Sequence, residues 1–251
     1  MGEMEQGAYV DSLLNLESLR KSLVRQEDTI IFSLIERSKY PINSRLYHES
    51  NAASPLHFFI NESEAVQAKA GRYVSPEENA FFPDSLPHPM LPPPKHKPVL
   101  HPSGASININ EKIFNHYLKT LIPLVAAKGA DDGNYATTAA SDLACLQALS
   151  RRIHFGKFVA EVKFRDSPQD YTPAILAKDR EGLMALLTFE SVEEAIKKRV
   201  EKKAMVFGQD VENQESGNFK VKPSLVSQLY GEWVIPLTKF VQVEYLLRRL
   251  D

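Results

Sequence analysis

Two long basic side chains, Arg152 and Lys163, lie eleven residues apart near the middle of the chain. At about 100° per residue the pair misses three full helical turns by only about 20°, so one helix face would carry both, roughly 16 Å apart along the axis. Two cations leaning toward each other over this distance can bracket a small dianion. The more ordinary explanation is a solvated basic face.

Gly156 lies between these two cations, in a position where glycine costs a helix about 1 kcal/mol relative to alanine. A ligand that approaches the backbone closely would explain it. Close packing of another helix is the simpler explanation.

Uncharged polar side chains interrupt an apolar stretch near the end of the chain. Thr238 and Gln242 follow Ile235 at i+3 and i+7, so the three residues share one helix face. Buried polar groups need partners, which here are either a ligand or a neighbouring helix. Arg20 adds another cation beside an apolar seam, between Leu19 and Leu23.

The sequence contains no phosphate-binding glycine loop, no nucleophile elbow and no HExxH zinc motif. His154 and Cys145 are expected to be structural, the cysteine as a buried apolar residue. Fixed cations with neutral donors, and no nucleophile, metal or cofactor, suit electrostatic catalysis on an anionic small molecule.

Composition excludes several classes of protein. The 251 residues carry 30 Lys and Arg against 32 Asp and Glu, which argues against a nucleic-acid-binding surface. No apolar run approaches the ~20 residues of a membrane span, and a single cysteine excludes an intrachain disulfide framework. The amino-terminal residues show no targeting peptide or myristoylation pattern, so a cytosolic protein is expected.

The elements that position these groups are predicted to be helices, because apolar residues recur at three- and four-residue spacing. The predicted helices cover residues 11–38, 56–70, 108–127, 138–164 as one long central helix, 173–178 with 181–187, 191–206 opened by a capping box at 191–194, and 223–250 kinked at Pro236.

A proline-rich segment at about residues 75–104 must cross the molecule in an extended form, because proline fixes φ and lacks an amide donor. A polar loop is expected at about residues 208–220. No strand pairs, hairpins or repeats are visible, so the sequence predicts an all-α multi-helix bundle forming a single domain over residues 1–251.

Three long stretches of the sequence are distinctive: NLESLRKSLVRQEDTIIFSLIERSKYPIN, DDGNYATTAASDLACLQALSRRIHFGKFVAEVKFRDSPQDY and YGEWVIPLTKFVQVEYLLRRLD. On these stretches the chain closely resembles the eukaryotic helical chorismate mutases, particularly the cytosolic plant form. The resemblance covers essentially the whole chain. It implies a homodimeric all-α enzyme that converts chorismate to prephenate on the way to phenylalanine and tyrosine, without a cofactor.

The resemblance also implies roles for single residues. Arg20 and Arg152 would grip the substrate carboxylates, Lys163 would donate to the ether oxygen, Glu193 would hold the hydroxyl, and Thr238 would help at a carboxylate. Ile235 would line the substrate site.

Two positions near the substrate depart from the fungal pattern. Gln242 replaces a glutamate that must be protonated to donate to the ether oxygen. An amide donates at any pH, so we expect activity from neutral into mildly alkaline conditions. Phe189 aligns with an asparagine that lies near the substrate in the fungal enzymes; it is expected to line the substrate site with Ile235, while the contact that it makes there is left open.

A further departure concerns regulation. Relatives controlled by tryptophan or tyrosine use a Gly-Ser pair and two arginines at the dimer interface, where this chain has Ala136, Thr137, Gly71 and Arg72. A methyl group on the former glycine would crowd the effector, and one arginine is lost. The sequence therefore predicts an enzyme that aromatic amino acids do not regulate.

A different class of function has to be weighed against the enzyme: a catalytically silent helical dimer that acts as a binding or regulatory scaffold. The basic residues favour the enzyme, because a scaffold has no reason to bury unpaired cations in a pocket.

Overall fold

The computed structural model describes residues 15–48, 53–92, 98–209 and 219–251. In these residues every regular element is a helix, and β-structure is confined to isolated bridges such as that between Gln209 and Phe219. The all-helical prediction is confirmed. The α-helices are α2 (Leu16–Arg37), α3 (Pro55–Lys69), α4 (Pro102–Ala105), α5 (Asn110–His116), α6 (Ile122–Val125), α7 (Tyr135–His154), α8 (Gly156–Asp166), α9 (Pro168–Leu176), α10 (Arg180–Leu187), α11 (Glu190–Gly208), α12 (Pro223–Leu229) and α13 (Ile235–Leu246).

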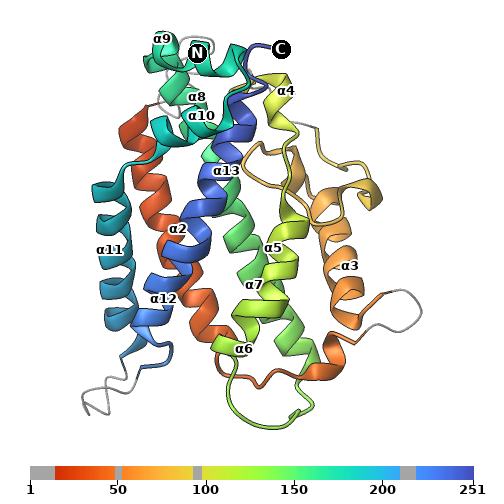
Figure 1. The fold of residues 1–251 in the computed structure, drawn as a ribbon. Helices are drawn as coiled ribbons and strands as arrows, with labels where there is room; N and C mark the ends of the chain where they lie inside the picture. The colour runs from red at the N-terminus through yellow and green to blue at the C-terminus, as the bar shows by residue number, and fades with distance from the viewer. Residues whose placement is uncertain (1–14, 49–52, 93–97, 210–218) are drawn as a thin grey trace, which may run out of the picture.

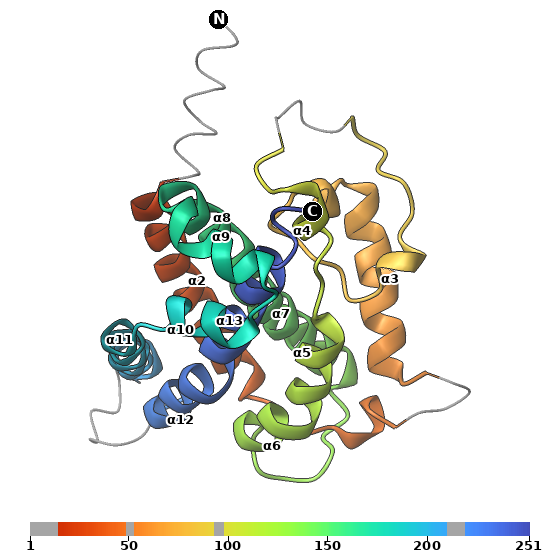
Figure 2. The same ribbon diagram turned by 45° about the horizontal axis from the view of Figure 1, so that its top comes forward.

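Helix α13 lies at the centre of the bundle, with α2 and α11 on one side and α3 on the other (Figure 1, Figure 2). It packs against α7, α8 and α10, while α2 packs along α7 and α11 lies on α12 and α2. One cluster of buried apolar side chains runs from Leu19 to Leu247 and joins these helices. The most central helix therefore carries Thr238 and Gln242.

The predicted long helix over residues 138–164 is two helices, α7 and α8, separated at Phe155. Phe155 keeps right-handed helical torsion angles (φ −59°, ψ −15°) and forms a one-residue turn from which α8 follows directly on α7. The first helix also begins earlier than predicted, at Tyr135. Consequently Arg152 lies in the last turn of α7, and Lys163 lies in α8 rather than in the same helix.

The predicted final helix, over residues 223–250, divides into α12, a π-helical turn η5 (Tyr230–Val234) and α13. A proline ring within a helix clashes with the carbonyl group four residues earlier. The wider π turn directly before Pro236 gives that ring room. A second π turn, η4 (Tyr117–Leu121), precedes Pro123 and interrupts the helix predicted over residues 108–127.

The predicted capping box at residues 191–194 is wrong, because α11 begins one residue earlier, at Glu190, and has no side-chain cap. The carbonyl group of Phe189 instead accepts hydrogen bonds from the amides of Val192 and Glu193, both at 3.0 Å. The helix predicted from residue 173 likewise starts at Pro168 and contains Pro173 in its interior. For the second helix a local signal was available, because Pro168 occupies its first turn, where proline is favoured.

Parts of the two predicted non-helical segments, residues 93–97 and 210–218, lie outside the described residues. In the described part of the proline-rich segment, helical structure is limited to the 3₁₀ turn η3 (Pro83–Ser85) and the start of α4. The Lys157 ammonium group holds the chain that follows, donating to the carbonyl groups of Ala105 (3.0 Å) and Ile107 (3.2 Å). None of the described helices is both long and apolar enough to cross a membrane.

Candidate active site

Gly156 brings the helices of the candidate site into close contact. A Cβ atom at this position would lie 2.7 Å from the carbonyl oxygen of Thr238 and 3.4 Å from Cγ of Gln242. Only glycine therefore allows α8 to pack this closely on α13. Of the two explanations for Gly156, close packing of another helix is the one that the structure supports.

Arg152 reaches this helix contact from the end of α7. Its side chain is buried, with 4% of the residue exposed. Its Nη1 donates to Thr238 Oγ1 at 3.3 Å, and the guanidinium lies 5.9 Å from the centre of the Tyr230 ring. Its buried Nε has no hydrogen-bond partner among the described residues. Burial lowers the Arg152 pKa. The side chain is a buried cation without a paired carboxylate among the described residues.

Thr238 and Gln242 lie on the buried face of α13, one helical turn apart. The Thr238 hydroxyl donates to the carbonyl of Val234 at 2.6 Å and so directs its lone pairs toward Arg152. Gln242 is 5% exposed, and its Oε1 finds no partner among the described residues. Ile235 is also buried but makes no polar contact through its side chain. Neutral polar groups thus lie beside a cation in an otherwise apolar region.

Lys163 on α8 is half-buried, and within the described residues no carboxylate pairs with it. Burial, and secondarily the charge of Arg20, lower its pKa to about 8. The ammonium group lies 4.6 Å from the centre of the Phe189 ring, which comes from the connection between α10 and α11. Arg20 itself is exposed on α2. Two positive charges from different helices therefore act on each other across the site.

Glu193 on α11 accepts an ion pair from Lys239 on α13 at 2.8 Å. Lys239 also donates to Thr188 Oγ1 at 3.2 Å. The sequence analysis missed Lys239, although a lysine directly after Thr238 in the apolar stretch LTKFVQV was an available signal. A carboxylate already held by a lysine can still accept a hydrogen bond from a hydroxyl group.

The structure brings the sequence-predicted site residues together in two direct contacts, and links Glu193 to α13 through Lys239. Arg152 contacts Thr238, and Lys163 contacts Phe189, while Arg20 reaches Lys163 through its charge. Such a set of unpaired cations and neutral donors can bind a small anion and stabilise charge that develops on it.

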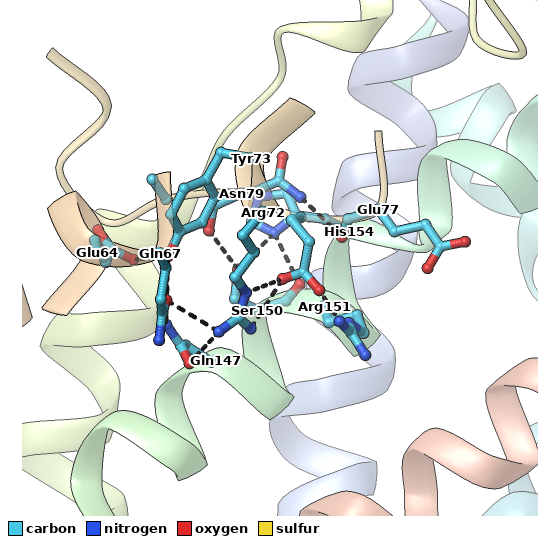
Figure 3. A network of polar contacts seen from close by, with 12 residues as sticks. Glu64, Gln67, Arg72, Tyr73, Glu77, Asn79, Gln147, Ser150, Arg151 and His154 are labelled. Atoms are coloured by element: carbon cyan, nitrogen blue, oxygen red, sulfur yellow. Dashed lines mark hydrogen bonds and ion pairs between the residues drawn. The ribbon is translucent and has the colours of Figure 1, made fainter. Parts of the chain in front are cut away.

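The predicted effector-site counterparts lie in two other places. Gly71 has a left-handed backbone (φ 88°) after α3, and Arg72 follows it. The Arg72 guanidinium donates to Glu78 at 3.0 and 3.1 Å and to the side-chain oxygens of Gln67 and Gln147 at 3.0 and 2.7 Å (Figure 3). Ala136 and Thr137 are exposed in the first turn of α7.

His154 is part of the structural framework beside this network. Its Nε2 accepts a hydrogen bond from the amide of Ile109 at 2.9 Å, so Nδ1 carries the proton and donates to the carbonyl of Ser150. Burial, with the charge of Lys157, lowers the His154 pKa to about 3. The imidazole is therefore neutral and fully engaged.

Comparison with known proteins gives consistent results. A family model described as chorismate mutase type II matches residues 134–243. The chain is 61% identical to chorismate mutase 2 of Petunia hybrida, over 96% of this chain and 95% of the relative, and 57% identical to that of Arabidopsis thaliana, over 99% and 98%. It is also 51% identical to a cytosolic chorismate mutase 2 of Zea mays, over 95% and 97%.

Solved structures of similar proteins correct the prediction about regulation. The structure of AtCM1 with tyrosine bound in its allosteric site is 52% identical, with a TM-score of 0.85 over 94% of this chain and 97% of that chain. The same protein is known with phenylalanine in that site, and the Aro7p enzyme of Candida albicans, 39% identical with a TM-score of 0.91 over 96% and 94%, is known with L-Trp.

These relatives contradict the prediction that aromatic amino acids do not regulate the enzyme. Ala136, on which the steric argument rested, is exposed in this chain. One of the two arginine positions also keeps its guanidinium, in Arg72. Two substituted positions were too narrow a basis for the prediction.

Proposed function

The chain belongs to the chorismate mutase family, and from this premise we propose that the site around Arg152 converts chorismate to prephenate by electrostatic catalysis. The reaction is a [3,3]-sigmatropic rearrangement in which a C–O bond breaks as a C–C bond forms. No bond to the protein is needed. The enzyme has to hold the compact conformer of a flexible dicarboxylate and stabilise the charge that separates along the breaking bond.

The observation that carries this proposal is the burial of Arg152 without a carboxylate partner among the described residues. An unpaired buried charge is costly, and several kcal/mol of desolvation are repaid only by a well-placed counter-charge. Glu27, the carboxylate whose charge acts on Arg152, is itself held by Arg199 at 2.6 Å and Lys203 at 3.0 Å. A ligand carboxylate is the partner that Arg152 lacks.

The remaining groups fit roles around that carboxylate. Arg20 is assigned to the second carboxylate, Lys163 and the Gln242 amide to the ether oxygen, and Glu193 to the substrate hydroxyl. Thr238 assists Arg152. A rate gain near 10⁶ corresponds to about 8 kcal/mol. One preorganised donor supplies about 3–4 kcal/mol, so two or three of these donors are sufficient without covalent chemistry.

The test is the loss of chorismate absorbance after addition of purified protein. Arg152→Ala is expected to lower kcat/KM by a factor of 10² to 10³ or more, because it removes a charged donor. Circular dichroism should show unchanged helicity. Arg151→Ala is the matched control, because Arg151 points to Glu78 instead, and it should keep its activity.

Equal activity of the Arg152→Ala variant and the unmodified protein would refute the assignment of the site. The alternative function, a silent helical scaffold, predicts no turnover by any of these proteins. The family relatives and the unpaired cation both disfavour it.

Three further properties belong to this proposal. The single continuous apolar core from Leu19 to Leu247 supports one domain over the chain. The homodimer rests on the family resemblance, and sedimentation of the purified protein tests it. A cytosolic location is supported by the relative from Zea mays, whereas other relatives are chloroplastic; imaging of the tagged protein in plant cells distinguishes the two.

A further inference from the structure

Lys163 differs from the other buried or half-buried cations around the site in what surrounds its charge. Lys239 is paired with Glu193 and donates to Thr188. Arg152 donates to Thr238. For Lys163, the contact that the described residues supply is the face of an aromatic ring, Phe189, at 4.6 Å from its nitrogen.

Phe189 has no evident packing role that would explain this position. The residue is 51% exposed, so most of its apolar surface gains nothing from the core. A ring left at the surface with its face toward an ammonium group is the geometry of a cation–π contact, which forms within about 6 Å of the ring centre. The contact between Phe189 and Lys163 is therefore the interaction that this ring makes.

The backbone that carries the ring is fixed from both sides. The Phe189 carbonyl accepts hydrogen bonds from the amides of Val192 and Glu193 in the first turn of α11, both at 3.0 Å. The preceding Thr188 donates its hydroxyl to the carbonyl of Met184 at 2.8 Å and accepts from Lys239 at 3.2 Å. A ring on such a connection can hold a flexible lysine side chain in one place.

We propose that Phe189 is a positioning residue, which holds the Lys163 ammonium group over the site through its ring face and keeps it protonated without a competing carboxylate. The inference rests on the proposed function, in which Lys163 donates to the ether oxygen. This role explains how Phe189 can contribute to the site although its side chain cannot make a polar contact with the substrate. An anionic partner in place of the ring would neutralise the ammonium group before substrate arrives.

The charge balance around Lys163 supports this role. Arg20 on α2 opposes protonation of Lys163, as does burial. Glu193 on α11 is paired with Lys239 on α13, and Gln242 on α13 is neutral. Among these neighbours, the quadrupole of the Phe189 ring is the one that favours the charged form of Lys163.

The first experiment measures the Lys163 pKa directly. Protein labelled with ¹³Cε-lysine is titrated by NMR, and the Lys163 signal is assigned by its loss in Lys163→Arg. In Phe189→Leu, which keeps an apolar side chain but removes the ring, the Lys163 pKa should fall by about half to one unit. Phe189→Tyr keeps the ring and should leave the pKa unchanged. An unchanged pKa in Phe189→Leu would overturn the proposal.

The second experiment records the pH dependence of kcat/KM for chorismate. The alkaline limb of Phe189→Leu should move to lower pH by the same amount, and Phe189→Tyr should restore it. Phe58→Leu, at another exposed phenylalanine on α3, is the control and should match the unmodified protein. A uniform loss of activity with an unmoved limb would mean that Phe189 is merely structural.

The two experiments separate the two ideas. If no protein, including the unmodified one, converts chorismate, the proposed function fails while the titration still decides whether the ring supports the charge. If Phe189→Leu melts at a much lower temperature, Phe189→Met replaces it in both experiments with the same expected results.

Discussion

Substitution of Gly156 by alanine tests whether the contact between α8 and α13 sets the geometry of the site. The added Cβ atom would lie 2.7 Å from the carbonyl oxygen of Thr238 and 3.2 Å from its Cγ2. Non-bonded carbon atoms prefer about 3.5–4.0 Å, so the two helices must separate by roughly 0.5 Å. The atoms that move belong to Thr238 and Gln242, both assigned to the substrate.

The expected magnitude follows from two opposing terms. Alanine gains about 1 kcal/mol of helix propensity over glycine, and overpacking costs about 1–3 kcal/mol, so the free energy of unfolding should change by between about 0 and −2 kcal/mol. Activity should suffer more than stability. A misplacement of about 1 Å costs about 10²-fold, so half of that displacement predicts a loss of roughly tenfold in kcat/KM.

The assay combines chorismate turnover with urea denaturation of the same preparation. Gly208→Ala is the matched control, because a Cβ atom at this buried helical glycine meets its nearest neighbour at an ordinary 3.6 Å. That variant should keep its activity and be no less stable than the unmodified protein, because no clash opposes the gain in helix propensity. Gly156→Ala with full activity and raised stability would refute the reasoning, since the close packing would then serve neither the fold nor the site.

Two further predictions concern Lys163 in the site and the buried Lys157, six residues earlier in the same helix. Burial and Arg20 lower the Lys163 pKa to about 8, and the protonated form is the proposed donor, so kcat/KM should be high below pH 8 and fall as the pH rises through it. The Gln242 amide does not titrate in this range. A kcat/KM that falls as the pH is lowered from 8 toward neutral would contradict this prediction. Lys157→Met should lower the free energy of unfolding, measured by urea denaturation, by about 2 kcal/mol or more. The substitution leaves three acceptors without their donor: Asn79 Oδ1 and the carbonyl groups of Ala105 and Ile107. An unchanged midpoint of urea denaturation would show that water replaces the ammonium group.

The alkaline limit near pH 8 sharpens an expectation drawn from the sequence. Gln242 removes the need for an acidic pH, and the sequence analysis extended activity into mildly alkaline conditions on that ground alone. Lys163, which we assign to the ether oxygen with Gln242, would set the upper limit, because burial and Arg20 lower its pKa. Neither the burial nor the distance between α2 and α8 can be predicted from residue types.

Helical periodicity predicted where the helices lie, because burial of one face imposes a spacing that is visible in the sequence. Proline predicted the kink at Pro236, but the breaks at residues 117–121 and at Phe155 were not predicted. The π turns before Pro123 and Pro236 are responses to a proline ring, and their width depends on the backbone that surrounds them. The break at Phe155 leaves no local signal, since its torsion angles remain helical.

The predicted site was most accurate where two side chains share a helix contact. Arg152 was singled out by its spacing from Lys163 and Thr238 as a polar residue in an apolar stretch, and the structure brings the two side chains to 3.3 Å. Lys239 was missed because a lysine is expected to be exposed to solvent unless its ion-pair partner is known. Its partner, Glu193, lies 46 residues away along the chain and was itself mistaken for part of a helix cap.

A net charge of −2 hides how positive the site is, because charge at a site depends on which carboxylates are already paired. Glu27 and Glu193 are the acidic groups beside the site, and each is held by lysine or arginine from another helix. Pairing of Glu27 by two cations limits how far it can neutralise Arg152. Arg152 and Lys163 therefore keep their charge uncompensated among the described residues, and a dianionic substrate completes the balance.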